Sequence, residues 1–76
     1  MNYRQMLINA IQYYTKKGYI PQLKTWEMPT LEVEKIVDYC FSIEHNKSFE
    51  EFNNNTNLGY YANEQEIKKI IEKRKV

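Results

Sequence analysis

The sequence predicts an all-α protein, a compact bundle of three main helices plus one short helix, with an irregular apolar strap between helices one and two. Three observations support this fold class. Residues suited to capping helix starts recur along the chain, apolar residues follow them at helical spacing, and no two segments read as strands that could pair. The 76 residues allow one domain, which we assign to residues 1–76.

The first helix is predicted over residues 3–17. Asn2 and Gln5 have the spacing of a capping box, in which a short polar side chain accepts a hydrogen bond from the backbone three residues on. Gly18 suits the left-handed conformation that commonly follows a helix end. The apolar residues that recur at helical spacing are Tyr3, Met6, Leu7, Ala10, Ile11 and Tyr14.

The second helix is predicted over residues 31–45. Thr30, just after Pro29, is its candidate cap, and His45 in its last turn is placed where a cation favours the helix dipole. Its apolar stripe is Val33, Ile36, Val37, Cys40 and Ile43, with Phe41 beside it.

Two further capping boxes each place Glu three residues after a short polar residue: Ser48 with Glu51, and Asn63 with Glu66. They predict a short helix over residues 48–53 and a last helix over 64–74. We expect the core to combine one stripe from each helix: Met6, Leu7, Ile11, Val33, Ile36, Val37, Cys40, Phe49, Phe52, Ile67, Ile70 and Ile71.

The strap over residues 19–28 is more apolar than a solvated linker. Ile20 precedes Pro21, which favours an extended backbone at Ile20. The segment is compatible with a short helical turn begun by Pro21 or with an irregular strap across the bundle. An edge strand would lack a second strand for pairing. We therefore expect a strap or a short turn.

Composition bears on where the protein works. The longest apolar runs are a few residues, so we expect no membrane span, and Met1 leads directly into a polar cap rather than a signal peptide. Cys40 is the only cysteine, which rules out a disulfide within the chain. These features predict a cytoplasmic protein with no membrane partner.

Charge is segregated along the chain, although the net charge is +1. Residues 1–26 hold four bases and no acid (+4), residues 27–52 hold two bases and seven acids (−5), and residues 53–76 hold five bases and three acids (+2). A nearly neutral protein is a poor candidate for tight nonspecific binding of nucleic acid, which depends on neutralising phosphates. Segregation still leaves room for a local basic face.

Enzymatic chemistry is poorly supported. Cys40 falls on an apolar stripe, where a lone thiol behaves as a small hydrophobic residue. His45 lies five residues later, about 140° around the same helix, so the two residues do not form a local pair. The chain has too few His and Cys residues for a zinc site and no spacing typical of a calcium loop. We expect no catalytic residue, no metal site and no cofactor.

One segment resembles a DNA-binding family. Residues 11–21 contain the pattern Gly-Tyr-x-Pro at positions 18–21. They resemble the end of the first helix in winged helix-turn-helix repressors of the SOS-repressor type, where such a turn precedes a short second helix. The resemblance covers about a dozen residues and implies a short second helix after the proline, with Leu23 and Trp26 at two of its apolar positions. The sequence departs from the family's pattern at Gln22, Thr25 and Pro29.

DNA binding therefore remains an alternative, and the helix after the motif is acidic, unlike a recognition helix. Its candidate phosphate contacts are the bases of the two ends of the chain: Lys16, Lys17, Lys24, Lys68, Lys69, Lys73, Arg74 and Lys75. For the five bases of the last helix and its end, we favour the simpler explanation of a solvated helix face with cations near the helix C-terminus.

The preferred hypothesis is a small noncatalytic accessory or regulatory protein that binds another protein with a basic surface. Aromatic residues and Met are enriched in interface cores, and an acidic helix face next to them would supply a charged rim. The hypothesised surface consists of Tyr19, Ile20, Trp26, Met28, Glu34 and Asp38. A homodimeric structural module, formed through a self-complementary aromatic patch, is a third alternative.

Overall fold

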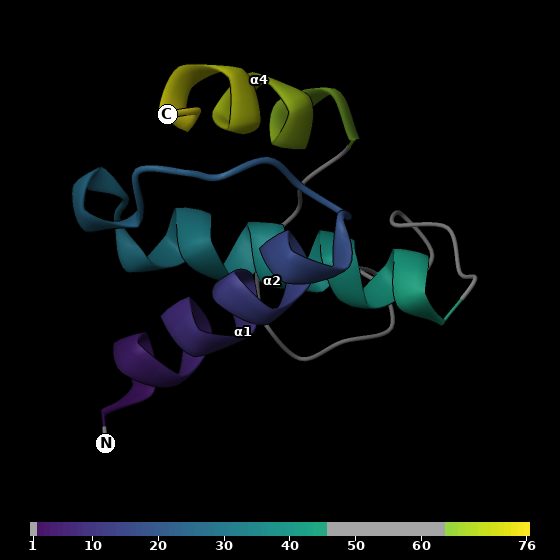
Figure 1. Ribbon diagram of the computed structural model, residues 1–76. Coiled ribbons are helices and arrows are strands. Elements are labelled where there is room, and N and C mark those ends of the chain that lie inside the picture. The colour runs from purple at the N-terminus through teal and green to yellow at the C-terminus, as the bar shows by residue number, and fades with distance from the viewer. Residues whose placement is uncertain (1, 46–63) are drawn as a thin grey trace.

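The computed structural model describes residues 2–45 and 64–76, which form three α-helices and one short 3₁₀ turn (Figure 1). The helices are α1 (Tyr3–Lys17), α2 (Thr30–Glu44) and α4 (Glu64–Arg74), and the turn is η1 (Thr25–Glu27). The predicted all-α class is confirmed, and the bounds of the first and last helices are as predicted. The short helix predicted over residues 48–53 lies outside the described residues.

Local signals fix both ends of α1. The Asn2 Oδ1 atom accepts a hydrogen bond of 2.7 Å from the Gln5 backbone N–H, so Asn2 is the cap that the sequence predicts. Gln5 does not complete a capping box, because its side chain donates to Asn9 Oδ1 instead. Gly18 ends the helix with φ of 88°, a left-handed conformation that a residue without Cβ adopts at no steric cost.

The second helix starts one residue earlier and ends one residue earlier than predicted. Thr30 is its first helical residue, and its side chain makes no capping hydrogen bond, so the prediction of Thr30 as cap was wrong. The Thr30 Oγ1 atom instead accepts a hydrogen bond of 3.1 Å from Arg4 Nη1. The Thr30 hydroxyl, which the local sequence predicts as a cap, therefore binds Arg4 of the first helix.

The helix α2 lies between the other two (Figure 1). It packs against α1 on one side and against α4 on the other. The helices α1 and α2 run in roughly the same direction, so the strap between them has to return along the bundle. The helix α4 runs opposite to α2, and the strap passes between α4 and the two other helices.

The strap is part of the core. Ile20 and Met28 are only 4% and 2% exposed. Leu23, which lies between them in the sequence, is fully buried. Leu23 also forms an isolated antiparallel bridge with Lys75. The strap bends at Tyr19 and Ile20, forms no helix over residues 21–24, and then makes the single turn η1, so the short turn exists but does not begin at Pro21.

Most of the predicted core is confirmed. Its buried members are Ile11, Val33, Ile36, Cys40, Ile67 and Ile70, and the partly buried residues packed against them include Leu7, Val37 and Ile71. Met6 was wrongly assigned, because it is 55% exposed on the outer side of α1. Phe49 and Phe52 lie outside the described residues. The core gains four residues that the prediction omitted: Tyr14, Ile20, Leu23 and Met28.

Two ion pairs join α2 to α4. Arg74 Nε donates to Glu32 Oε1 at 3.0 Å, and Arg74 Nη2 lies 3.4 Å from Glu32 Oε2. Lys35 pairs with Glu66 on the same two helices. Glu32 and Lys35 lie within one turn near the start of α2, whereas Arg74 and Glu66 lie near opposite ends of α4.

We predict that Ile36→Ala lowers the free energy of unfolding by about 2–5 kcal/mol, the usual cost of emptying a buried isoleucine site. Ile36 is fully buried in the centre of the bundle. Ile43→Ala on the same helix is the matched control, since Ile43 is more than a third exposed. Urea unfolding followed by circular dichroism measures both variants, and similar losses for the two would contradict this packing.

Candidate protein-binding surface

The turn η1 presents Trp26 to solvent on a backbone that is held at both ends. The Glu27 N–H donates to the Lys24 carbonyl at 3.0 Å, and the Met28 N–H donates to the Thr25 carbonyl at 3.1 Å. Leu23 before the turn and Met28 after it are buried. Between these anchored residues the Trp26 side chain is directed outward and is 68% exposed.

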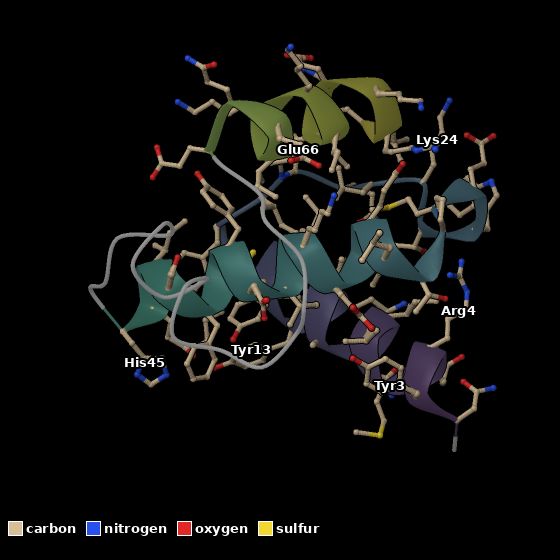
Figure 2. The ribbon with its side chains drawn as sticks, turned by 180° about the vertical axis from the view of Figure 1, so that it is seen from behind. Tyr3, Arg4, Tyr13, Lys24, His45 and Glu66 are labelled. Atoms are coloured by element: carbon tan, nitrogen blue, oxygen red, sulfur yellow. The ribbon has the colours of Figure 1, made fainter. Side chains whose placement is uncertain are left out.

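Arg4 fastens this turn to the two helices that flank it. Its Nη2 atom donates to the Thr25 carbonyl at 3.0 Å, and its Nη1 atom donates to Thr30 Oγ1 at 3.1 Å. One guanidinium group on α1 therefore holds the first residue of η1 and the first residue of α2. Figure 2 shows Arg4 reaching from the N-terminal part of α1 toward this region. The planar guanidinium, with its fixed donors, suits such a double contact.

The structure separates the strap residues of the hypothesised surface. Ile20 and Met28 belong to the core and are not available to a partner. Tyr19 is half-buried, and its ring centroid lies 5.7 Å from that of Tyr14. Trp26 is the one strap member of the hypothesised set that is mostly exposed.

The two acids of the hypothesised rim are also partly occupied. Tyr3 donates its hydroxyl to the Glu34 carboxylate, and this hydrogen bond is the largest cause of a raised pKa at Tyr3; burial and the charges of Glu34 and Asp38 raise the pKa further. Glu34 is half-buried, and Asp38 is only 8% exposed. Asp38 therefore cannot serve as an open rim charge. Glu27, on the same turn as Trp26, is exposed.

The bases of the DNA-binding alternative fall into two groups. Six are exposed: Lys16 and Lys17 at the end of α1, Lys68, Lys69 and Lys73 on α4, and Lys75 just after α4. The other two are engaged or shielded: Arg74 pairs with Glu32, and Lys24 is half-buried. The exposed Lys75 also lies 3.4 Å from the exposed Glu72.

The helix that the repressor resemblance implies does not form. After Pro21 the backbone is extended, Leu23 is buried, and Trp26 lies in a turn of three residues rather than in a second helix. The resemblance therefore stops at Gly18, where the first helix ends.

Local sequence patterns could not predict two features, one at this surface and one in the first turn of α2. Arg4 acts on residues 21 and 26 positions away, which local patterns cannot reveal. Leu31 is about half exposed in the first turn of α2, although it belongs to an apolar residue type. The solvent exposure of a single leucine depends on how neighbouring elements pack, so it cannot be predicted from residue type alone.

Cys40 is buried in the core, and His45 lies beside an aromatic ring and a carboxylate. Cys40 is fully buried in the core, as expected, and burial followed by the charge of Glu44 raises the pKa of its thiol to about 12. The His45 ring lies 4.1 Å from the Phe41 ring, and its Nε2 atom is 3.7 Å from Glu44 Oε1. Among residues 2–45 and 64–76, no group of three or more His, Cys, Asp or Glu side chains could hold a metal ion.

Within the same described ranges, no helix has the length and apolar character needed to cross a membrane. Comparison of the chain with protein-family models, curated proteins and solved structures finds no match. Function must therefore be inferred from the residues of this chain.

We predict that Arg4→Met loosens η1. Hydrogen bonds from a charged donor contribute about 1.5–3 kcal/mol each, so losing them should speed exchange of the Glu27 and Met28 amide hydrogens by about tenfold or more. Gln12→Met, on the exposed side of the same helix, is the control and should leave exchange unchanged. Hydrogen exchange followed by NMR measures both variants. Unchanged protection of the Glu27 and Met28 amides in Arg4→Met would show that η1 is stable without the Arg4 hydrogen bonds.

We predict that Cys40 resists alkylation in the folded protein. Its thiol pKa rises from 9.0 to about 12, so below pH 9 the folded thiol is ionised roughly a thousandfold less than the unfolded one. Between about pH 9 and 12 only the unfolded chain releases this proton, so folding stability should fall with rising pH there. Iodoacetamide labelling with and without guanidinium chloride tests the first point; rapid labelling of folded protein would refute it.

Proposed function

We propose that the protein is a small noncatalytic accessory or regulatory protein that binds another protein, with Trp26 as the anchor of the contact. The observation that carries the proposal is the exposure of Trp26 on a turn that the rest of the fold fixes. Tryptophan is among the residues most often found at binding hot spots, and it is usually well buried in a free protein.

Rigidity supports the same role. Binding loses affinity when a loop or side chain has to be ordered on contact, so a pre-ordered anchor binds with a smaller entropic loss. The hydrogen bonds from Arg4 and the buried neighbours Leu23 and Met28 order the backbone of η1 before any partner arrives. The tryptophan side chain itself has only two rotatable bonds to fix.

The partner that suits this surface has an apolar pocket with a basic rim. Glu27 is exposed on the same turn as Trp26. Glu34, which follows Trp26 by eight residues and lies on α2, is half-buried. Glu32 is already neutralised by Arg74, and Asp38 is buried, so few acids remain for the rim. Rim charges act mainly on the rate of association, which leaves Trp26 as the main source of affinity.

The pull-down that tests this proposal uses three forms of the protein in extract of the native host. Wild type, Trp26→Ala and Tyr13→Ala are compared, and both protein and nucleic acid in the bound fraction are identified by mass spectrometry. Tyr13→Ala is a matched control, because it removes an exposed aromatic ring from a different helix. Circular dichroism confirms that each variant is folded.

We expect one protein to be recovered with wild type and Tyr13→Ala but lost with Trp26→Ala. With that protein purified, Trp26→Ala should weaken binding by about 2 kcal/mol or more, and Glu27→Lys should mainly slow association. Recovery of nucleic acid that Trp26→Ala retains and Lys16→Glu with Lys17→Glu abolishes would reject the proposal in favour of the DNA-binding alternative.

A further inference from the structure

A second stripe of residues runs along the outer side of α1. Its members are three, four, three and four residues apart: Tyr3, Met6, Ala10, Tyr13 and Lys17. That spacing keeps them on one face of a helix and is the repeat by which helices pair side by side. Tyr3, Met6 and Tyr13 are each about half exposed, and Lys17 is exposed.

This stripe borders the face of α1 that packs in the bundle, because Ala10 is partly buried against the core and Tyr3 contacts Glu34 on α2. Met6 and Tyr13, in contrast, are about half exposed. Ile11 and Tyr14 are buried against the core, and Leu7 packs beside them. An exposed stripe of three large side chains in addition to a complete core face is more than the fold of α1 requires. The stripe is also ordered: Tyr3 is hydrogen bonded to Glu34, and Lys17 Nζ lies 5.4 Å from the centre of the Tyr13 ring.

The stripe is nearly symmetric about Ala10: Tyr3 and Lys17 each lie seven residues from it, and Met6 and Tyr13 lie four and three residues from it. When a second copy of α1 is laid antiparallel across it, with the two-fold axis at Ala10, Met6 of one copy faces Tyr13 of the other. Tyr3 of one copy then faces Lys17 of the other. A small residue at the crossing point lets two helices approach closely, and methionine sulfur packs favourably on aromatic rings.

Charge matches the same arrangement. The Tyr3 end of the stripe carries the Glu34 carboxylate, which the Tyr3 hydroxyl holds in place. The Tyr13 end carries Lys17. An antiparallel pairing brings Glu34 of each copy to Lys17 of the other, so opposite charges meet twice. A two-fold interface requires such self-complementarity, because each patch must fit its own copy.

We propose that the protein forms a two-fold homodimer through this outer stripe of α1. The contact is separate from Trp26 and does not depend on the proposed partner. A single pair of crossed helices gives an interface at the small end of the known range. The dimer is therefore weak and concentration-dependent.

Charge reversal and mixing test the dimer by sedimentation over a series of protein concentrations. Lys17→Glu and Glu34→Lys, each alone, put like charges at both contacts and should weaken dimerisation by about tenfold or more. In an equal mixture of the two variants, the mixed dimer has opposite charges at both contacts, so dimerisation should return to the wild-type level. The double variant within one chain should also dimerise.

Two controls keep the test specific. Lys16→Glu makes the same charge change one position along α1 and off the stripe, so dimerisation should persist. Trp26→Ala should dimerise like wild type. Circular dichroism checks that the variants fold. A wild-type protein that stays monomeric at every concentration, a loss with Lys16→Glu equal to that with Lys17→Glu, or no recovery in the mixture would each overturn the dimer.

Discussion

The described fold depends on the burial of a segment that is not helical. A short chain has little apolar surface to bury, and here the strap supplies Ile20, Leu23 and Met28 to the core. Burying an extended segment is costly unless its backbone polar groups find partners. The strap finds them at the other end of the chain: the Lys24 N–H donates to the Arg74 carbonyl at 2.7 Å, and the Val76 N–H donates to the Gln22 carbonyl at 3.0 Å.

This exchange also serves α4. The last carbonyl groups of a helix have no partner within the helix. The Arg74 carbonyl is one of these, and the Lys24 amide satisfies it. The Arg74 side chain meanwhile pairs with Glu32 on α2, so one residue joins the strap, α4 and α2. The two ion pairs across the α2–α4 contact have opposite senses: Glu32 of the middle third meets Arg74 of the last third, whereas Lys35 of the middle third meets Glu66 of the last.

The elements that could be predicted from the sequence are those set by local interactions. The ends of α1 follow from Asn2 and Gly18, whose effects operate within one helical turn. The strap could be recognised as apolar, but composition cannot distinguish a buried strap from an exposed binding surface. Ile20 and Met28 were therefore assigned to a surface, whereas they complete the core.

Helical periodicity left a similar ambiguity on α1. Met6 and Leu7 are adjacent in sequence and 100° apart around the helix, and both fit an apolar stripe. Two stripes exist on α1, and only the position of α2 determines which of them faces the core. Met6 therefore lies outside the core although its residue type favours burial. The candidate site depends on the same long-range geometry, because Arg4 reaches η1 only once α1 and α2 have packed.

The first turn of α1 then links the two proposed surfaces without merging them. Arg4 points to one side and holds the turn that carries Trp26, while Tyr3, the residue before it, points to another side and binds Glu34. Successive residues of a helix are 100° apart, so neighbouring side chains can serve different neighbours. Both contacts are made inside the free chain. A partner at Trp26 and a second copy along the outer stripe each meet a surface already in place, and neither event requires the other.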